Sequence, residues 1–133
     1  MDNYEEYLKG STFLNSLNNE IDKGSEKYEK HRNKMMGLNQ AMFVMFDKDQ
    51  IIFPQVSEIF GEASKKDSNG HRTNVKMEDT ESYKNDDLGL KYLNEHHKLH
   101  TVHIDAKHTD YKDEHINNTF LPFLKQWNQY EII

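Results

Sequence analysis

The most informative segment of this 133-residue chain is Ala41-Met42-Phe43-Val44-Met45-Phe46-Asp47-Lys48-Asp49. It begins with a run of apolar residues and ends in a polar, acidic turn. The apolar run is too short for an independent helix, and it suits a strand that is buried on both faces, as in a parallel sheet. We therefore predict a strand over residues 41–46, with Asp49 in the loop at its carboxyl end.

A second strand is predicted over residues 98–105, where apolar side chains recur in a nearly alternating pattern. His108 follows this strand in a loop. Hydrolases of the α/β class present two of the three members of a Ser-His-Asp triad in this way, with an acid after one strand and a His in a later loop. Asp49 also has a simpler interpretation as the turn acid that commonly follows a strand, and at this point both interpretations stay open.

The third member of such a triad, the nucleophile, is missing from the pattern. The nucleophile elbow of this class needs Gly-x-Ser-x-Gly around a tight turn between a strand and a helix. The six glycines stand at positions 10, 24, 37, 61, 70 and 89, so no two have that spacing. Ser11 and Ser25 each follow a Gly within a polar stretch, and we interpret them as cap and turn residues.

Four helical segments are predicted from apolar spacing and capping residues. They cover Ser11 to Leu17, Ser25 to about Gly37, a short piece around Leu88, Leu90 and Leu93, and a final helix from about Asp113 to Gln126. The apolar face of the final helix consists of Ile116, Phe120, Phe123, Leu124 and Trp127, and Pro122 within it is expected to kink or shorten it. Residues 61–87 are almost wholly polar and are predicted to form a long surface loop.

Composition narrows the class of protein. The length suits one domain, and although the mean hydropathy is −1.01, the apolar residues are clustered enough to predict folded pieces joined by polar loops. The net charge of −6, with 17 basic against 23 acidic residues, argues against nucleic-acid binding. The absence of cysteine excludes disulfides and thiolate metal sites.

Targeting signals are not apparent in the sequence. No apolar run approaches the roughly 20 residues of a membrane span. The acidic first residues are not followed by the apolar core of a secretory signal. Taken as complete, the chain is therefore expected to be cytoplasmic.

A His-rich segment suggests a metal site as an alternative function. On a helix, His96, His97, His100 and His103 could offer imidazoles to one ion. The apolar residues between them favour an extended chain instead, in which His100 and His103 point to opposite faces. No His-Glu-x-x-His motif is present, so neither a metal nor another cofactor is predicted.

Four motifs follow one another along the chain in a specific order. They are Tyr7 to Leu14 with Leu17 to Glu20, then Phe43 to Phe46 with Asp49, Ile51, Ile52, Pro54, Ser57, Phe60 and Gly61, then Leu88 to Lys91, and finally His108 with Ile116 and Leu121 to Leu124. Together these motifs resemble the C-terminal portion of palmitoyl-protein thioesterases of the lysosomal type. Three positions depart from the family pattern, where Ile59 replaces a Trp, Ala106 a Gly, and Lys107 an acidic residue.

The resemblance implies a fold and a site. Residues 1–133 would be the C-terminal part of an α/β-hydrolase fold, with two parallel strands, about four helices and long loops, and without the half that carries the nucleophile. The implied reaction is hydrolysis of palmitoyl thioesters on proteins, with Asp49 and His108 as catalytic residues. Ile51 and Ile52 would contact the fatty chain, no cofactor would be needed, and the location would be lysosomal.

The same resemblance has consequences for partners. The strand at 41–46 would be paired on one side only, so we expect incomplete burial of Phe43, Val44 and Met45 and an exposed sheet edge. An N-terminal thioesterase half, or another chain, would cover this edge, and the chain alone is expected to be inactive. A non-catalytic interaction module is the alternative, and retention of both Asp49 and His108 favours the thioesterase fragment over it.

Overall fold

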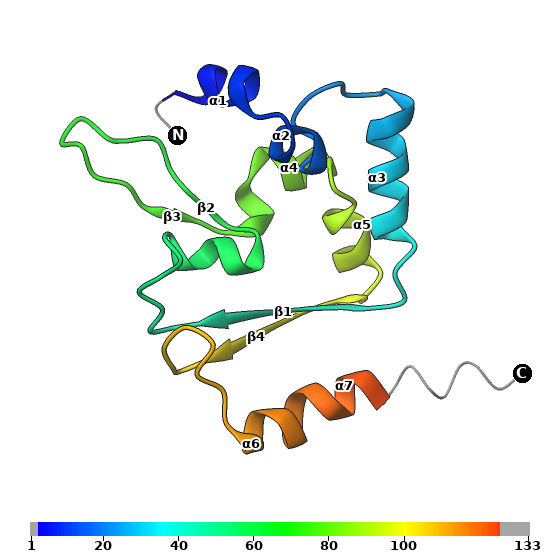
Figure 1. The fold of residues 1–133 in the computed structure, drawn as a ribbon, viewed down its shortest axis with the longest axis vertical. Coiled ribbons are helices and arrows are strands. Elements are labelled where there is room, and N and C mark those ends of the chain that lie inside the picture. The colour runs from blue at the N-terminus through cyan, green and yellow to red at the C-terminus, as the bar shows by residue number, and fades with distance from the viewer. Residues whose placement is uncertain (1–2, 126–133) are drawn as a thin grey trace, which may run out of the picture.

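The computed structural model describes residues 3–125. Two parallel strands, β1 (Ala41–Phe46) and β4 (Leu99–Ile104), lie side by side, with helices on both sides of them (Figure 1). Their register pairs Ala41 with Leu99 and Phe46 with Ile104. Both strands and their parallel direction are therefore confirmed, as a partial α/β arrangement.

The burial of β1 is lower than that of a central strand. Only its two end residues, Ala41 and Phe46, are buried, and the four residues between them are half-buried. The interpretation of this strand as buried on both faces is thus wrong, whereas the expected incomplete burial of Phe43, Val44 and Met45 is confirmed. The reason is that β4 is the one strand paired with β1 among residues 3–125.

The part of the chain before β1 is built from short helices. They are α1 (Tyr4–Gly10), α2 (Leu14–Leu17) and α3 (Glu26–Met36). Helix α3 confirms the prediction in detail, because the Ser25 side chain accepts the backbone N–H of Tyr28 and the helix ends at Gly37. Helix α1 was not predicted from the sequence, since its residues are mostly polar and it buries no side chain.

Residues 61–87 are not a loop without structure, so that prediction is wrong. They form an antiparallel pair, β2 (Glu62–Ala63) and β3 (Asn74–Val75), a 3-10 turn η2 (Met77–Asp79) and helix α4 (Glu81–Lys84). Three side chains in this region are buried, those of Met77, Thr80 and Asp87. Thr80 begins α4 by accepting the N–H of Tyr83, which a search for apolar periodicity does not detect.

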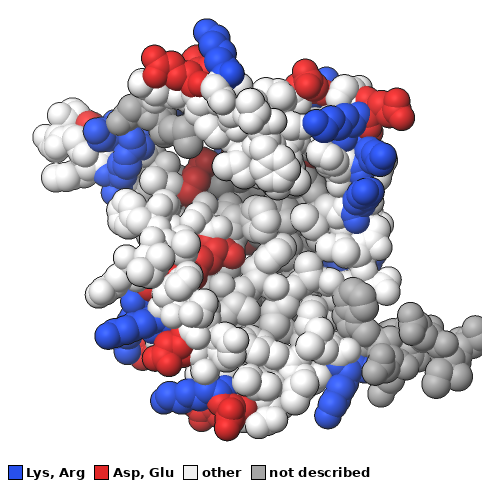
Figure 2. Space-filling model, viewed as in Figure 1, with Lys and Arg blue, Asp and Glu red and all other residues white. Residues whose placement is uncertain are grey.

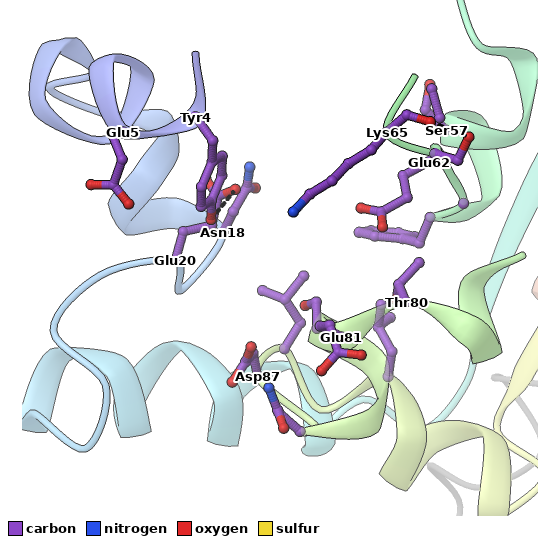
Figure 3. A pocket seen from close by; sticks show the side chains of 18 of the residues that line it. Tyr4, Glu5, Asn18, Glu20, Ser57, Glu62, Lys65, Thr80, Glu81 and Asp87 are labelled. Carbon is purple, nitrogen blue, oxygen red and sulfur yellow. Dashed lines mark hydrogen bonds between the residues drawn. The ribbon is translucent and has the colours of Figure 1, made fainter. Parts of the chain in front are cut away.

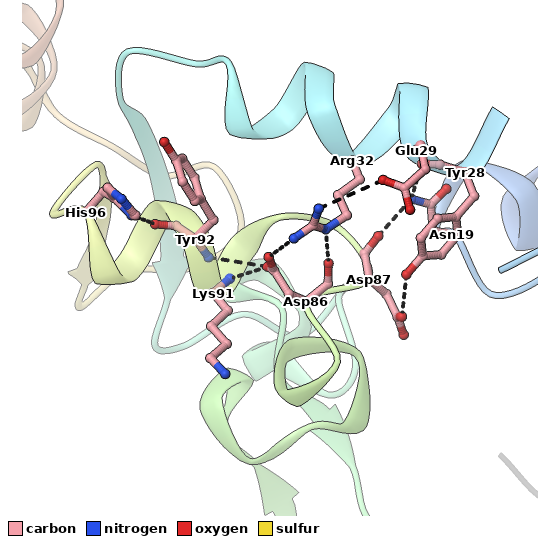
Figure 4. Close-up of polar contacts among 9 residues, drawn as sticks. All are labelled: Asn19, Tyr28, Glu29, Arg32, Asp86, Asp87, Lys91, Tyr92 and His96. Atoms are coloured by element: carbon pink, nitrogen blue, oxygen red, sulfur yellow. Dashed lines mark hydrogen bonds and ion pairs between the residues drawn. The ribbon is translucent and has the colours of Figure 1, made fainter. Parts of the chain in front are cut away.

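Helix α3 and helix α5 (Leu90–Glu95) are joined by a polar network (Figure 4). Arg32 of α3 contacts Asp86 twice, with Nε donating to the backbone carbonyl at 2.8 Å and Nη2 to the carboxylate at 2.6 Å. The other oxygen of Asp86 accepts the backbone N–H groups of Lys91 and Tyr92 at the start of α5. One carboxylate therefore both pairs with α3 and satisfies donors at the first turn of α5.

The final helical region begins at Asp113, as predicted. It consists of α6 (Asp113–His115), a π-helical turn η3 (Ile116–Phe120) and α7 (Leu121–Lys125), while Gln126 and Trp127 lie outside the described residues. Pro122 has no N–H to donate, and just before it the chain changes to the wider π-type bond from Leu121 N–H to Ile116 O. The Phe123 ring packs edge-on against His100 of β4, with 5.6 Å between centroids.

The described residues contain more helical segments than the expected four. Many of these helices end after only one or two turns. Among residues 3–125, no helix is long and apolar enough to cross a bilayer. Figure 2 shows charged side chains mainly at the margins of the viewed face, and uncharged residues over most of its centre.

Candidate functional site

The loops that follow β1 and β4 lie together, because parallel strands present their carboxyl ends at the same edge of a sheet. Two backbone hydrogen bonds tie these loops, from Asp47 N–H to Ile104 O at 2.9 Å and from Lys48 N–H to Ala106 O at 3.0 Å. An ion pair between Lys48 and Asp105, at 2.8 Å, adds to them on the surface. The sheet therefore aligns residues far apart in the sequence.

Asp49 and His108 meet at this edge. His108 Nδ1 lies 2.6 Å from Asp49 Oδ2, so the contact expected from the sequence is present. The Asp49 side chain is fully buried, whereas the His108 side chain is 37% exposed. Because an ionised carboxylate can only accept, Nδ1 carries the proton, and Nε2 is the ring nitrogen that a substrate or a nucleophile can reach.

The backbone that follows β1 holds Asp49 in its ionised form. Its Oδ1 accepts the N–H groups of Ile51, at 2.6 Å, and Ile52, at 3.1 Å. Burial acts to raise the pKa of this carboxyl, but hydrogen bonds from Glu58, Ile51, His108 and Ile52 outweigh burial and lower it. Asp49 thus stays a carboxylate beside the imidazole at all ordinary pH values.

Ile51 and Ile52 contribute main-chain groups rather than packed side chains. Ile51 is 72% exposed and Ile52 is half-buried. Phe53, the next residue, is 90% exposed. The three side chains therefore offer apolar surface close to the Asp49–His108 pair.

Glu58 is the residue of this site that the sequence analysis missed. It lies in a 3-10 turn, η1 (Gln55–Ile59), and its Oε2 accepts the backbone N–H of Phe46 at 2.7 Å. One of its carboxyl oxygens lies within 4.8 Å of ligand atoms of both Asp49 and His108. The available signal was an acid in the Pro-x-x-Ser-x-Trp-Phe-Gly loop motif, but it occupies one of the unspecified positions of that motif.

The side chains of Asp49, Glu58 and His108 are also potential metal ligands. Within the described part of the chain, Asp49, Glu58 and His108 form the one group with three potential ligand atoms within 4.8 Å of one another. Their oxygens already accept hydrogen bonds from the backbone and from His108, so the cluster has the character of a hydrogen-bonded site rather than a metal cage. The His-rich segment does not converge on one point, since His103 pairs with Asp47 and His96 with the carbonyl of Tyr92.

A hollow in the surface of the described residues lies away from this cluster. It is an open cleft of about 1300 Å³ between α1, the β2–β3 pair and α4 (Figure 3). Its lining includes Tyr4, Glu20, Lys65 and Asp87, and it contains none of Asp49, Glu58 and His108. The polar contacts around it are largely internal, such as that of Tyr4 with Glu20, so the chemistry points to the sheet edge instead.

A protein family model and two curated proteins match most of this chain. The family model of palmitoyl protein thioesterases matches residues 1–108. The chain belongs to this family. The matched region of this thioesterase-family chain includes both Asp49 and His108.

Two curated relatives of the thioesterase family are similar over most of this chain. Palmitoyl-protein thioesterase 1 of Caenorhabditis elegans is 32% identical over 104 residues, which is 78% of this chain and 33% of the relative. A palmitoyl-protein thioesterase-dolichyl pyrophosphate phosphatase fusion of Schizosaccharomyces pombe is 33% identical over 105 residues, which is 79% of this chain and 16% of the relative. The chain therefore spans a third or less of the length of these relatives.

Proposed function

We propose that this chain is the part of a palmitoyl-protein thioesterase that supplies the acid and the base of a Ser-His-Asp triad. Asp49 is the acid and His108 is the base. The observation that carries the proposal is the 2.6 Å contact between His108 Nδ1 and buried Asp49 Oδ2, inside the region that matches the family. Such a contact orients an imidazole and stabilises its charged form.

In the proposed mechanism the nucleophilic Ser comes from a segment that is not part of this sequence. As the Ser oxygen attacks the thioester carbonyl, its proton passes to His108 Nε2, and a tetrahedral intermediate forms. When the carbon–sulfur bond breaks, the imidazolium gives this proton to the leaving thiol. Water then attacks the acyl-Ser ester, with His108 again taking and giving up a proton, and palmitate is released.

The proposed substrate is a palmitoylated protein, and the fatty chain is assigned to the apolar surface beside the pair. Ile51 and Ile52 are the residues proposed to contact the chain, and the exposure of Ile51 is consistent with this role. A lysosomal location is proposed on the family likeness alone.

Complementation tests the proposal. The chain is co-expressed with the half of a related thioesterase that carries Gly-x-Ser-x-Gly, and hydrolysis of an S-palmitoylated peptide is measured. We expect turnover by the pair and none above background by this chain alone, because His108 then has no nucleophile to activate. His108→Ala should abolish turnover, and Asp49→Asn should lower kcat by roughly 10⁴-fold, the order seen when a triad carboxylate is removed.

His103→Ala is the matched control for the His108 variant. His103 also contacts an Asp, with its Nδ1 3.0 Å from Asp47 Oδ1, but both residues of this pair are exposed, whereas the Asp49 side chain is buried. This variant should leave turnover unchanged. Steady turnover by the unpaired chain that His108→Ala removes would reveal a nucleophile within this sequence, and equal effects of the two His variants would contradict the assignment of His108.

A further inference from the structure

Glu58 brings a second carboxyl group close to Asp49. Its Oε2 accepts the N–H of Phe46 at 2.7 Å, and an oxygen of its carboxyl lies within 4.8 Å of an oxygen of the buried Asp49 carboxyl. An ionised carboxylate accepts only, so a bond between two carboxyls needs one proton. Asp49 already accepts the N–H groups of Ile51 and Ile52 and the His108 ring, which leaves the proton on Glu58.

The position of Glu58 follows from the sheet. N–H groups alternate between the two sides of a parallel strand, and those of Ala41 and Asp47 point to β4. The N–H of Phe46 therefore points to the other edge of β1, where Glu58 accepts it. Glu58 therefore covers the carboxyl end of that edge and also lies beside Asp49.

We infer that Glu58 is a positioning residue of this site, whose neutral carboxyl donates to Asp49, accepts the Phe46 N–H, and so fixes Asp49 in line with His108. The inference deepens the proposed function and rests on it. Glu58 does not touch the reacting atoms, and it acts through Asp49.

The surroundings support a neutral Glu58. Burial, the hydrogen bond to Asp49 and the charge of Asp49 raise its pKa, while the Phe46 N–H and the charge of His108 oppose them. The other charged groups of these loops face other partners, since Asp47 contacts His103 and Lys48 contacts Asp105. Asp49 and His108 are therefore the titratable groups that act on Glu58 from the packed elements.

Carboxyl NMR of the chain, which requires no enzymatic activity, tests the shared proton. The Glu58 side-chain carbon is followed against pH, and we expect it to titrate above 4.5, the ordinary value for a glutamate. Asp49→Asn removes the partner charge and should shift this titration downward. Asp47→Asn is the control, because Asp47 lies in the same loop but pairs with His103, and it should not shift it. Titration of Glu58 at or below 4.5 in the wild-type chain would overturn the inference.

A conservative pair of variants separates positioning from general structure. Glu58→Gln keeps a donor for Asp49 and an acceptor for Phe46, whereas Glu58→Ala removes both. In the complemented enzyme we expect Glu58→Ala to lower kcat by roughly ten- to a hundredfold with KM little changed, since small misplacements of catalytic groups have such effects. Glu58→Gln should restore most of the loss.

The two proposals can fail separately. If complementation yields no thioesterase but Glu58 titrates high, the shared proton stands and the assigned reaction falls. If complementation succeeds while Glu58→Ala retains full kcat, the triad assignment stands and the positioning role of Glu58 is wrong. Equal losses of kcat in Glu58→Gln and Glu58→Ala would also contradict a role through hydrogen bonding.

Discussion

At the scale of single residues, buried polar side chains connect parts of the chain that are distant in sequence. Asn19 donates to the backbone carbonyls of Tyr28 and Asp87, at 3.0 and 2.7 Å. Asp87 in turn accepts the Tyr28 hydroxyl at 2.7 Å and pairs with Lys23 at 2.8 Å. These bonds join α3 to the segment before α5, and their loss would leave buried groups unsatisfied.

Tyr28→Phe tests this network. Removing a hydrogen bond to a charged group costs roughly 1.5–3 kcal/mol, so the variant should be less stable by about that amount. Tyr111→Phe is the control, because that ring is 48% exposed, and it should change stability by less than about 0.5 kcal/mol. Urea unfolding of the three proteins gives the comparison.

The stability that the Tyr28–Asp87 hydrogen bond contributes should change with pH in a definite direction. Burial, together with the bond to Asp87, raises the pKa of Tyr28 from 10.0 to about 12. A group whose pKa is raised by folding contributes its stability fully below the unfolded value and loses it as pH rises through the folded value. The advantage of wild type over Tyr28→Phe should therefore be constant below pH 10.0 and shrink as pH rises toward about 12. An advantage that grows over this range would contradict the assignment.

At the scale of elements, Gly61 allows η1 and β3 to lie close together. Phe60 ends η1 in the left-handed region with φ 62°, and a Cβ on Gly61 would lie 2.7 Å from Val75 O and 2.8 Å from Val56 Cβ. Both distances are too short for real contacts, and the nearest atom belongs to backbone that cannot rotate away. The close approach therefore fixes the turn that carries Glu58.

Gly61→Ala should displace η1 or β3. Overpacking of this kind costs about 1–3 kcal/mol, so we expect a loss of that size together with a changed Glu58 environment. Gly10→Ala is the matched control, because a Cβ there meets nothing within 4 Å. Thermal unfolding and the Glu58 carbon resonance measure both effects. Equal stability of the two variants would show that η1 yields more readily than these distances imply.

At the scale of the whole molecule, β1 has one neighbouring strand among residues 3–125 and half-buried residues along its middle. Alternation places the N–H groups of Met42 and Val44 on the edge away from β4. Glu58 covers only the carboxyl end of this edge. An edge of this kind is a site for strand addition by another chain.

We therefore expect the purified chain to self-associate and the complementing thioesterase half to suppress this. Val44→Pro should also reduce association, because it removes a donor on the free edge without breaking the β1–β4 ladder. Met45→Pro, the control, removes an N–H that faces β4 and should unfold the sheet. Light scattering and circular dichroism distinguish the outcomes, and a monodisperse wild-type chain with a sharp unfolding transition would show that the edge is closed.

Part of this molecule is determined by sequence alone. The strands at 41–46 and 99–104, the helix capped by Ser25, and the start of the last helix were all predictable. Each depends on apolar spacing or capping within one short segment, and such signals are local. Asp49 and His108 could be chosen as candidates because each follows a recognisable strand within a family motif.

Tertiary structure decided the rest. The contact of Asp49 with His108, the inclusion of Glu58, and the burial of Asn19 and Asp87 all depend on partners elsewhere in the sequence. A polar residue is buried only where a distant group satisfies it, so no local pattern can identify it in advance. The sequence therefore determines which segments pair, and only the packing of those pairs determines which carboxyl keeps its proton.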